Sequence, residues 1–154
     1  MRNPQIPFTK EGYEKIQKEY DELHVTRKDA VIELARARDM GDRSENAAYK
    51  VARQRLSSID SRIRHLGRLL RFGKIVEPPK TEEVGIGSTV VIDDGMSHKT
   101  YTIVGSYESD IPNGKLSCYS PIGKALMGKK LHEEIRVLAP AGQLRYRIIS
   151  ILYT

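Results

Sequence analysis

The chain has 154 residues, of which 39% are hydrophobic and 30% are charged, and its net charge is +6; this length accommodates one ordinary domain or two small ones. The sequence has no apolar run long enough for a membrane span. Its first residues lack the apolar segment of a signal peptide, which argues against secretion. The single cysteine, Cys118, excludes an internal disulfide and fits a reducing cytoplasm, and the scattered histidines offer no Cys/His metal cluster.

The first predicted element is a long helix, which begins after a capping Thr9 and ends at Gly41. Its apolar residues recur at steps of three and four, which is the pattern of a seam between packed helices. The seam positions are Tyr13, Ile16, Tyr20, Leu23, Arg27, Ala30, Leu34 and Ala37. Arg27 is charged, so we expect its side chain either to extend out of the seam or to pair with an acid.

A second helix is predicted up to Gly73, again with a seam at steps of three and four. Its seam positions are Tyr49, Ala52, Leu56, Ile59, Ile63, Leu66 and Leu70. Each helix has about 28 residues and a length of about 40 Å. The short polar break at residues 40–44 favours an antiparallel hairpin over a parallel dimeric coiled coil. In the break, Asp42 or Ser44 is expected to cap the second helix, with Glu45 completing a capping box.

The excess positive charge lies in the helical half of the chain. Residues 1–74 contain 17 Lys+Arg against 11 Asp+Glu, whereas residues 75–154 contain nine of each. Residues 46–72 carry one acid, Asp60, against a set of basic residues: Lys50, Arg53, Arg55, Arg62, Arg64, Arg68 and Arg71. This excess is either the solvated face of a coiled coil or a surface that binds a polyanion, usually nucleic acid.

After a connection rich in Pro and Gly near residues 75–86, the hydrophobic period changes to that of strands. A short strand is expected at residues 74–77, and the later strands at residues 89–93, 99–106, 115–119, 133–138 and 144–153. A short helix is expected between Ser120, its cap, and Gly128, its stop.

The sequence therefore predicts an α+β protein with two domains. Residues 1–75 form a long antiparallel coiled-coil hairpin, and residues 76–154 form a small domain of about five antiparallel strands and one short helix.

Two acids, Asp42 and Glu45, lie three residues apart at the predicted hairpin bend. One interpretation is structural, because negative charge stabilises the start of a helix. Paired carboxylates are also ligands for Mg²⁺, which takes one or two of them and completes its shell with water and phosphate oxygens. Two acids form half of such a site, so a partner would supply the rest. Arg38 and Arg53 nearby suit contacts with an RNA backbone.

The segment from Arg38 to Tyr49, RDMGDRSENAAY, resembles the tip motif of the GreA/GreB transcript-cleavage factors. Two further segments resemble that family: PFTKEG at residues 7–12, followed by YDEL at 20–23, and SPIGKALMGK at 120–129. The resemblance covers nearly the whole chain, and the GreA pattern fits slightly better. Many members carry an acid where this chain has Ala48, a departure that bears on the preferred length of the cleaved RNA.

The resemblance implies a coiled coil that enters the secondary channel of a backtracked bacterial RNA polymerase. Asp42 and Glu45 would help to hold the second catalytic Mg²⁺ and orient the attacking water, and the polymerase itself would cut the 3′ end of the nascent RNA. The protein would then be a monomer without catalysis or a cofactor of its own. The motif also assigns residues that shape the tip or contact RNA: Arg38, Asn46, Tyr49 and Arg53.

The second domain would be FKBP-like and would dock at the rim of the polymerase channel through Ser120, Pro121, Ile122, Gly123, Leu126 and Gly128. Two other functions are open. One is a non-cleaving regulator that occupies the channel, against which Asp42 and Glu45 argue. The other is a prolyl isomerase or a basic coiled-coil nucleic-acid binder unrelated to polymerase, which would bind free RNA or DNA through Arg53, Arg64 and Arg68.

Overall fold

The computed structural model describes residues 5–41 and 46–153 of the chain. Its elements in chain order are β1 (Ile6–Phe8), α1 (Lys10–Asp39), α2 (Ala47–Phe72), β2 (Gly73–Ile75), β3 (Ser88–Asp93), β4 (His98–Val104), η1 (Ser106–Glu108), η2 (Ile111–Asn113), β5 (Lys115–Ser117), α3 (Pro121–Leu126), β6 (Glu134–Ala139) and β7 (Gly142–Tyr153). They form two compact units, one built on residues 13–73 and the other on residues 5–12 together with 74–153.

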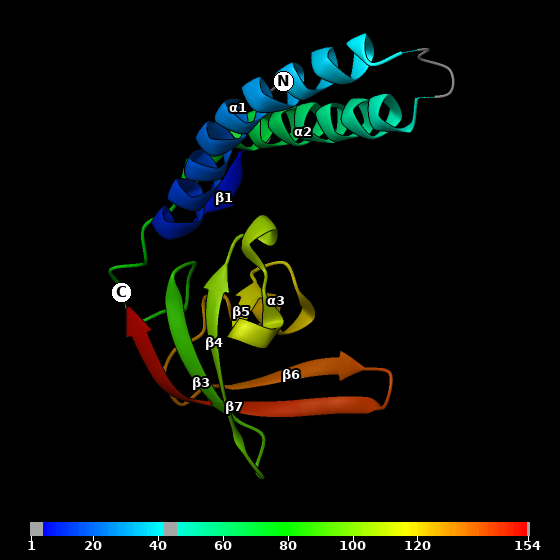
Figure 1. Cartoon of the computed structure of the whole chain (residues 1–154). Coiled ribbons are helices and arrows are strands. Elements are labelled where there is room, and N and C mark those ends of the chain that lie inside the picture. The colour runs from blue at the N-terminus through cyan, green and yellow to red at the C-terminus, as the bar shows by residue number, and fades with distance from the viewer. Residues whose placement is uncertain (1–4, 42–45, 154) are drawn as a thin grey trace. The chain divides into compact units, whose positions relative to one another are not determined.

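The helical unit is an antiparallel hairpin, in which α1 and α2 lie side by side (Figure 1). The direction is fixed by Tyr13, near the start of α1, whose hydroxyl donates to the main-chain carbonyl of Leu70, near the end of α2, at 3.1 Å. Every predicted seam residue is buried or half-buried, while most residues between them are exposed. The hairpin predicted from the steps of three and four is therefore confirmed.

The buried residues of the hairpin become smaller toward its bend. Leu66 is fully buried near the end of α2, whereas the buried residues closest to the bend are Ala37 and Ala52. Small side chains let the two backbones approach closely but remove less apolar area from water. The end of the hairpin near the bend consequently gains less from hydrophobic burial than its base.

Arg27, the charged residue of the seam, pairs with the only acid of α2. Its Nε donates to Oδ1 of Asp60 at 2.5 Å, and its Nη2 lies 3.5 Å from Oδ2. The expected pairing with an acid is confirmed. The pKa of Asp60 is lowered, first by this hydrogen bond and then by the charge of Arg27. The pair fixes the register of the two helices at one point, because a slip of one helix would separate the charges.

The second unit contains a five-stranded sheet with the order β5-β4-β3-β7-β6. β3 pairs antiparallel with both β4 and β7, and β6 pairs antiparallel with β7. Alternate residues of β3 are buried, as expected for a strand with one face on a core: Ser88, Val90 and Ile92. All five predicted strands are present within two residues of the expected ranges.

One strand runs in a direction that the sequence did not predict. β5 pairs parallel with β4, with Thr102 opposite Lys115, so the expectation of an entirely antiparallel sheet is wrong at this edge. The reason is the connection at residues 105–114, which is not a tight turn and contains η1 and η2. It returns Gly114 to Thr102, whose N–H donates to the Gly114 carbonyl at 2.7 Å. A parallel pair needs such a crossover.

The core of the second unit lies where α3 packs against β5 and β6. Ser120 caps α3 as predicted, because its Oγ accepts from the N–H of Gly123 at 3.1 Å. The fully buried apolar residues of this core are Val90, Ile92, Ile103, Leu126 and Ile148. Each large side chain of this kind contributes about 1.5–3 kcal/mol of burial free energy. This is the α+β domain expected from the sequence.

The first residues of the described chain pack in the second unit. Thr9 caps α1 as predicted, accepting from the N–H of Gly12 at 3.0 Å. The carboxylate of Glu108 accepts from the N–H of Thr9 at 2.9 Å and also bonds its hydroxyl. β1 pairs with β2, and Val76 donates its N–H to the Phe8 carbonyl at 2.8 Å. A strand as short as β1 carries too few residues for a recognisable alternation.

Candidate functional site

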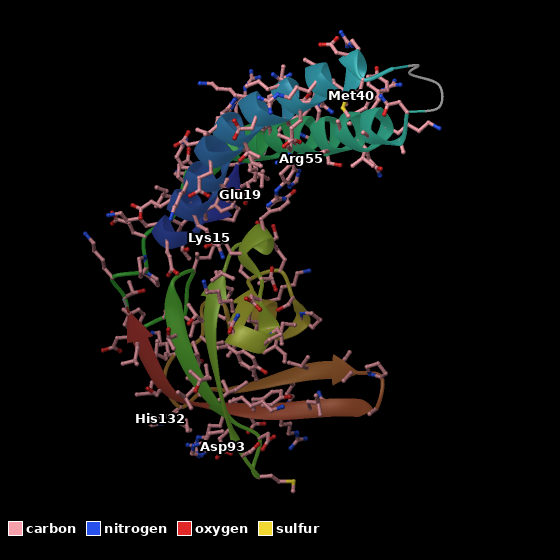
Figure 2. All side chains as sticks on the ribbon, in the orientation of Figure 1. Lys15, Glu19, Met40, Arg55, Asp93 and His132 are labelled. Carbon is pink, nitrogen blue, oxygen red and sulfur yellow. The ribbon has the colours of Figure 1, made fainter. Side chains whose placement is uncertain are left out.

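The two predicted acids, Asp42 and Glu45, lie outside the described residues, whereas both flanks of the bend are described. On the first flank, α1 ends at Asp39 and Gly41 has a φ of 143°. This positive φ favours glycine, because a Cβ would strain the backbone there. The predicted end of the first helix at Gly41 is confirmed. Met40, at the end of the hairpin far from Lys15, is 75% exposed (Figure 2).

On the second flank, the side chain of Asn46 bonds to the main chains of both helices. Its Oδ1 accepts from the N–H of Tyr49 at 3.1 Å, which satisfies one free donor at the start of α2. Its Nδ2 donates at 2.7 Å to the carbonyl of Ala37 near the end of α1, which also accepts from the N–H of Met40 at 3.3 Å. Asn46 therefore holds the two helix ends together at the base of the bend.

The N-cap of α2 is Asn46, and the helix begins at Ala47. The predicted capping by Asp42 or Ser44 is therefore wrong, since the helix begins later than the capping-box pattern assumed. Asn is among the strongest N-cap residues, so this cap needs no help from the acids of the bend. Helix capping is therefore a weaker explanation for the presence of Asp42 and Glu45.

The other residues assigned to RNA contact lie near the same end of the hairpin. Arg38 is exposed in the last turn of α1, and Arg53 is exposed on α2. Neither guanidinium forms an ion pair with a carboxylate of the described part of the chain. Tyr49 is half-buried, and its N–H is bound by Asn46. The structure thus places Arg38 and Arg53 toward the bend end of the hairpin, without an ion-pair partner among the described residues, and gives Tyr49 a place in the helix seam.

Two more ion pairs join the helices, besides the pair of Arg27 and Asp60. Arg62 binds Glu19 through two hydrogen bonds, with Nε to Oε1 at 2.7 Å and Nη2 to Oε2 at 3.0 Å. Arg55 likewise bonds to Glu33. In each pair the hydrogen bond from the arginine is the first cause that lowers the pKa of the glutamate. These arginines are neutralised by their partners, so they contribute little to a polyanion-binding surface.

Sequence reasoning did not predict a small apolar hollow near the bend. Its lining consists of alanines and exposed apolar side chains between charged residues: Glu33, Arg36, Ala37, Met40, Ala47, Ala48, Val51, Ala52 and Arg55. Val51 is 66% exposed. Val51 and Met40 lie off the seam, so they have no place in the hairpin's own packing, and this is the signal that would have identified them.

The six residues predicted to dock on polymerase divide by burial. Leu126 is fully buried, and a Cβ on the buried Gly123 would lie 2.0 Å from the carbonyl oxygen of Ser117. Neither residue presents a side chain to a partner; both fix the position of α3. The remaining four are exposed or half-buried: Ser120, Pro121, Ile122 and Gly128. Of the six predicted docking residues, these four have surface that a partner could contact.

Within residues 5–41 and 46–153, no group of three or more His, Cys, Asp and Glu side chains is arranged to hold a metal ion. Over the same residues, no helix combines the length and apolarity that crossing a bilayer requires. Cys118 is buried, and burial is the first cause that raises the pKa of its thiol. Cys118 belongs to the core of the second unit, as expected for a small structural side chain.

Comparison with known proteins matches both units to one family. Residues 6–75 match the family described as transcription elongation factor, N-terminal, and residues 78–153 match transcription elongation factor, GreA/GreB, C-term. The transcription elongation factor GreA of Pelobacter propionicus is 44% identical over 153 residues, which cover 96% of this chain and 97% of that protein. GreA of Thermodesulfovibrio yellowstonii is 43% identical with the same coverage.

Among solved structures, the chain is similar to GreA factor homolog 1 (Gfh1) of Thermus thermophilus. The identity is 25% and the TM-score is 0.46, and the match covers 96% of this chain and 99% of that one.

Proposed function

The chain belongs to the GreA/GreB family of transcription elongation factors, and from this premise we propose that its hairpin enters the secondary channel of bacterial RNA polymerase. There it stimulates the polymerase's own cleavage of the 3′ end of backtracked RNA and so rescues arrested complexes. The protein supplies acidic side chains to the polymerase and has no catalytic centre of its own.

One observation supports this proposal most strongly. The bend that carries Asp42 and Glu45 leaves and re-enters the hairpin at two points joined by Asn46, whose amide bonds to Ala37 and Tyr49. A bend with fixed ends on a helical rod is suited to deliver carboxylates into a narrow channel. The acids are also dispensable as helix caps, because Asn46 fills that position.

The donor set of the bend fits Mg²⁺ shared with a partner. Asp42 and Glu45 provide two carboxylates, and Mg²⁺ commonly takes one or two from protein. The described residues contain no cluster of three or more His, Cys, Asp and Glu side chains that could hold the ion by themselves. When bound, Mg²⁺ supplies a Lewis acid for phosphodiester hydrolysis. Asp42 and Glu45 would hold it together with the ligands of the polymerase and orient the attacking water.

Two arginines near the bend, Arg38 and Arg53, would have a role separate from that of the acids. Arg38 and Arg53 are exposed and form no ion pair with any carboxylate in the described ranges, so their guanidinium groups are available to phosphates of the extruded RNA. A planar guanidinium binds two phosphate oxygens at once and thereby fixes orientation as well as position. These contacts would align the RNA backbone beside the carboxylates.

The second unit would dock the protein at the rim of the channel. Its exposed or half-buried candidates are Ser120, Pro121, Ile122 and Gly128. We further propose that the protein acts as a monomer in the bacterial cytoplasm, where RNA polymerase and nascent RNA are found.

The proposal is tested with RNA polymerase halted in a backtracked state on a labelled transcript. The purified protein with Mg²⁺ should shorten the transcript from its 3′ end, and the shortened RNA should resume elongation. The same protein should leave free RNA intact, because the catalytic centre belongs to the polymerase. Slower elongation without RNA shortening would instead identify a non-cleaving channel regulator and would overturn the proposal.

A further inference from the structure

The strands β6 and β7 continue beyond the rest of the sheet as a two-stranded ribbon. β7 pairs with β3 from Arg147 to Tyr153, whereas residues 142–146 pair only with β6 within the described chain. Figure 1 shows the ribbon as two arrows that extend away from β3 and β4. One face of the ribbon is buried through residues such as Ile135 and Tyr146, and alternate residues on the other face are exposed. The ribbon therefore presents one side to solvent.

On this exposed face, two arginines lie directly opposite each other. Arg136 of β6 is the cross-strand partner of Arg145 of β7. The Cβ atoms of such partners are about 5 Å apart, and like charges in these positions destabilise the pair of strands. Arg145 forms no ion pair with a carboxylate in the described ranges, and Arg136 has one long contact, at 3.9 Å, with Glu134 of its own strand. The repulsion between the two guanidinium groups is therefore poorly compensated.

The neighbouring step of the same face shows the arrangement that charge alone favours. Arg147 lies opposite Glu134 on one side and opposite Asp93 on the other. Opposite charges across strands stabilise a sheet, and nothing in the strand pairing prevents an acid opposite Arg136. Residues 75–154 carry nine basic and nine acidic residues, so this half of the chain is neutral. The facing arginines are a local concentration of positive charge, and bound carboxylates would relieve their repulsion.

Apolar side chains follow the arginines toward the end of the ribbon. Leu138, two residues after Arg136 on the same face, is 83% exposed, and Leu144 is 41% exposed. Arginine beside exposed apolar surface is typical of protein interfaces. A phosphodiester backbone gives leucine no apolar group to contact, whereas an acidic protein segment offers carboxylates and apolar side chains together. The composition of this face therefore favours an acidic protein over a nucleic acid.

We propose that the exposed face formed by Arg136, Leu138 and Arg145, here called the ribbon face, binds an acidic segment of a partner protein. Carboxylates of that segment accept hydrogen bonds from the two guanidinium groups, which are suited to bind both oxygens of a carboxylate. An apolar side chain of the segment covers Leu138 and removes it from water.

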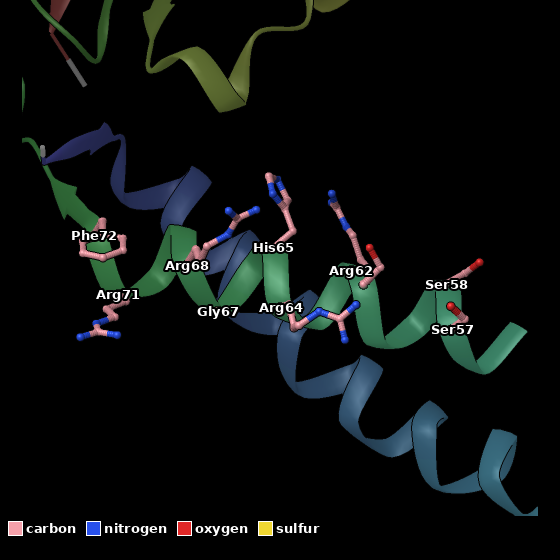
Figure 3. A pocket seen from close by; sticks show the side chains of 10 residues that line it. Ser57, Ser58, Arg62, Arg64, His65, Gly67, Arg68, Arg71 and Phe72 are labelled. Atoms are coloured by element: carbon pink, nitrogen blue, oxygen red, sulfur yellow. The ribbon is translucent and has the colours of Figure 1, made fainter. Parts of the chain in front are cut away.

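The ribbon face is separate from the surfaces of the proposed cleavage function. That function uses the bend of the hairpin and residues 120–128, and neither belongs to β6 or β7. The arginines of α2 in Figure 3, such as Arg64 and Arg68, belong to the helical unit and line a groove without a leucine. Arg68 is exposed and has no ion pair in the described ranges, so it provides a matched control for Arg145.

The test measures fluorescence anisotropy of a labelled peptide of Glu with two Leu residues, and of the same peptide with Gln in place of Glu. The natural chain should bind the Glu peptide and not the Gln peptide. Arg145→Glu should weaken binding by on the order of tenfold or more, because the new carboxylate also occupies Arg136. Arg68→Glu makes the same change of charge on α2 and should leave binding within about twofold.

The contribution of the apolar part has its own pair of variants. Leu138→Ser should weaken binding of the Glu peptide about fivefold, because the peptide then loses its apolar contact. Leu152, which is 58% exposed at the other end of β7, is the control, and Leu152→Ser should leave binding within about twofold. Equal effects of the two serine variants would overturn the assignment of Leu138 to the ribbon face.

Arg145→Glu also separates binding from folding. It places opposite charges across β6 and β7, so the thermal unfolding temperature should be equal to or above that of the natural chain. A lower unfolding temperature would show that Arg145 has a structural role and would overturn the proposal.

Three binding results would also overturn the proposal. In the first, the natural chain binds the Glu and Gln peptides equally, and in the second, Arg145→Glu and Arg68→Glu weaken binding of the Glu peptide equally. In the third, Arg145→Glu weakens binding of a labelled single-stranded RNA more than binding of the Glu peptide, because the ribbon face would then suit a nucleic acid. An Asp42→Asn, Glu45→Gln chain should bind the Glu peptide normally, which separates this result from the cleavage function.

Discussion

The side-chain amide of Asn46 donates a hydrogen bond to the main-chain carbonyl of Ala37, with a nitrogen–oxygen distance of 2.7 Å. The oxygen of the same amide accepts from the N–H of Tyr49 at 3.1 Å. One side chain thus caps the beginning of α2 and closes the end of α1. A carboxamide can donate and accept at once, whereas a carboxylate can only accept.

Substitution of Asn46 separates these two contacts. Asn46→Asp keeps the acceptor for Tyr49 and loses the donor to Ala37, while Asn46→Ala loses both. We expect Asn46→Asp to reduce RNA cleavage by on the order of 10–10²-fold, because catalytic geometry tolerates little displacement. Asn46→Ala should in addition lower the free energy of unfolding by about 0.5–2 kcal/mol in urea titrations. Cleavage by Asn46→Asp at the natural rate would show that the bond to Ala37 is unimportant.

The inter-helix ion pairs predict how the hairpin responds to acid. Hydrogen bonds from Arg62 and Arg27 are the first causes that lower the pKa values of Glu19 and Asp60. This stabilisation is fully present above the ordinary values of about 4.3 and 3.9 and is lost as pH falls through the lowered values. The urea midpoint followed by helical circular dichroism should therefore decrease below about pH 4.5.

Two matched variants test the acid response. One replaces an arginine that forms an inter-helix ion pair, and the other replaces an arginine that does not. Arg62→Gln should flatten the dependence of the urea midpoint on pH, because Glu19 then titrates near its ordinary pKa. Arg68→Gln removes the same charge and should leave the dependence unchanged. Equal profiles for both variants would contradict the contribution of the pair formed by Glu19 and Arg62.

Leu66 is the fully buried apolar residue of the hairpin seam on α2. Leu66→Ala should lower the free energy of unfolding by about 2–5 kcal/mol, since it leaves a cavity between the helices. Val25, which is 63% exposed on α1, is the control, and Val25→Ala should change the free energy by less than about 0.5 kcal/mol. Similar losses in calorimetry for both variants would contradict the assigned seam.

Substitution of Gly123 tests whether the segment at residues 120–128 has a structural role as well as a role in docking. A methyl group there would lie 2.0 Å from the Ser117 carbonyl oxygen, so Gly123→Ala should destabilise the second unit by about 1–3 kcal/mol. Pro121→Ala changes an exposed residue, so it should weaken binding to polymerase with little effect on thermal unfolding. A stable Gly123→Ala protein with normal unfolding would contradict the close packing of α3.

The hairpin was predictable because helix seams repeat over many turns. Steps of three and four between Tyr13 and Ala37 leave one consistent face, and Gly41 marks its end. The strands were predictable for a similar reason, since β-branched segments were separated by turn residues. The cap at Asn46 was missed because several residues of the bend suit that position, and only the coordinates show which of them begins the helix.

Contacts between distant segments could not be read from local patterns. Glu108 binds the N–H of Thr9, 99 residues earlier, and nothing near either residue indicates the other. The parallel direction of β5 depends on how residues 105–114 return the chain, which turn propensities do not determine. The pairing of Arg55 with Glu33 likewise decides which arginines remain available, and a count of charges in the sequence cannot separate them.

The most direct test of the whole account compares the natural chain with an Asp42→Asn, Glu45→Gln double variant on a backtracked polymerase complex. Both substitutions keep size and hydrogen-bonding ability while removing the negative charge that holds Mg²⁺. We expect the double variant to compete with the natural chain for polymerase at equal concentration and to lose RNA cleavage by a factor on the order of 10² or more. Cleavage at the natural rate by the double variant would contradict the claim that these carboxylates serve the catalytic centre of the polymerase.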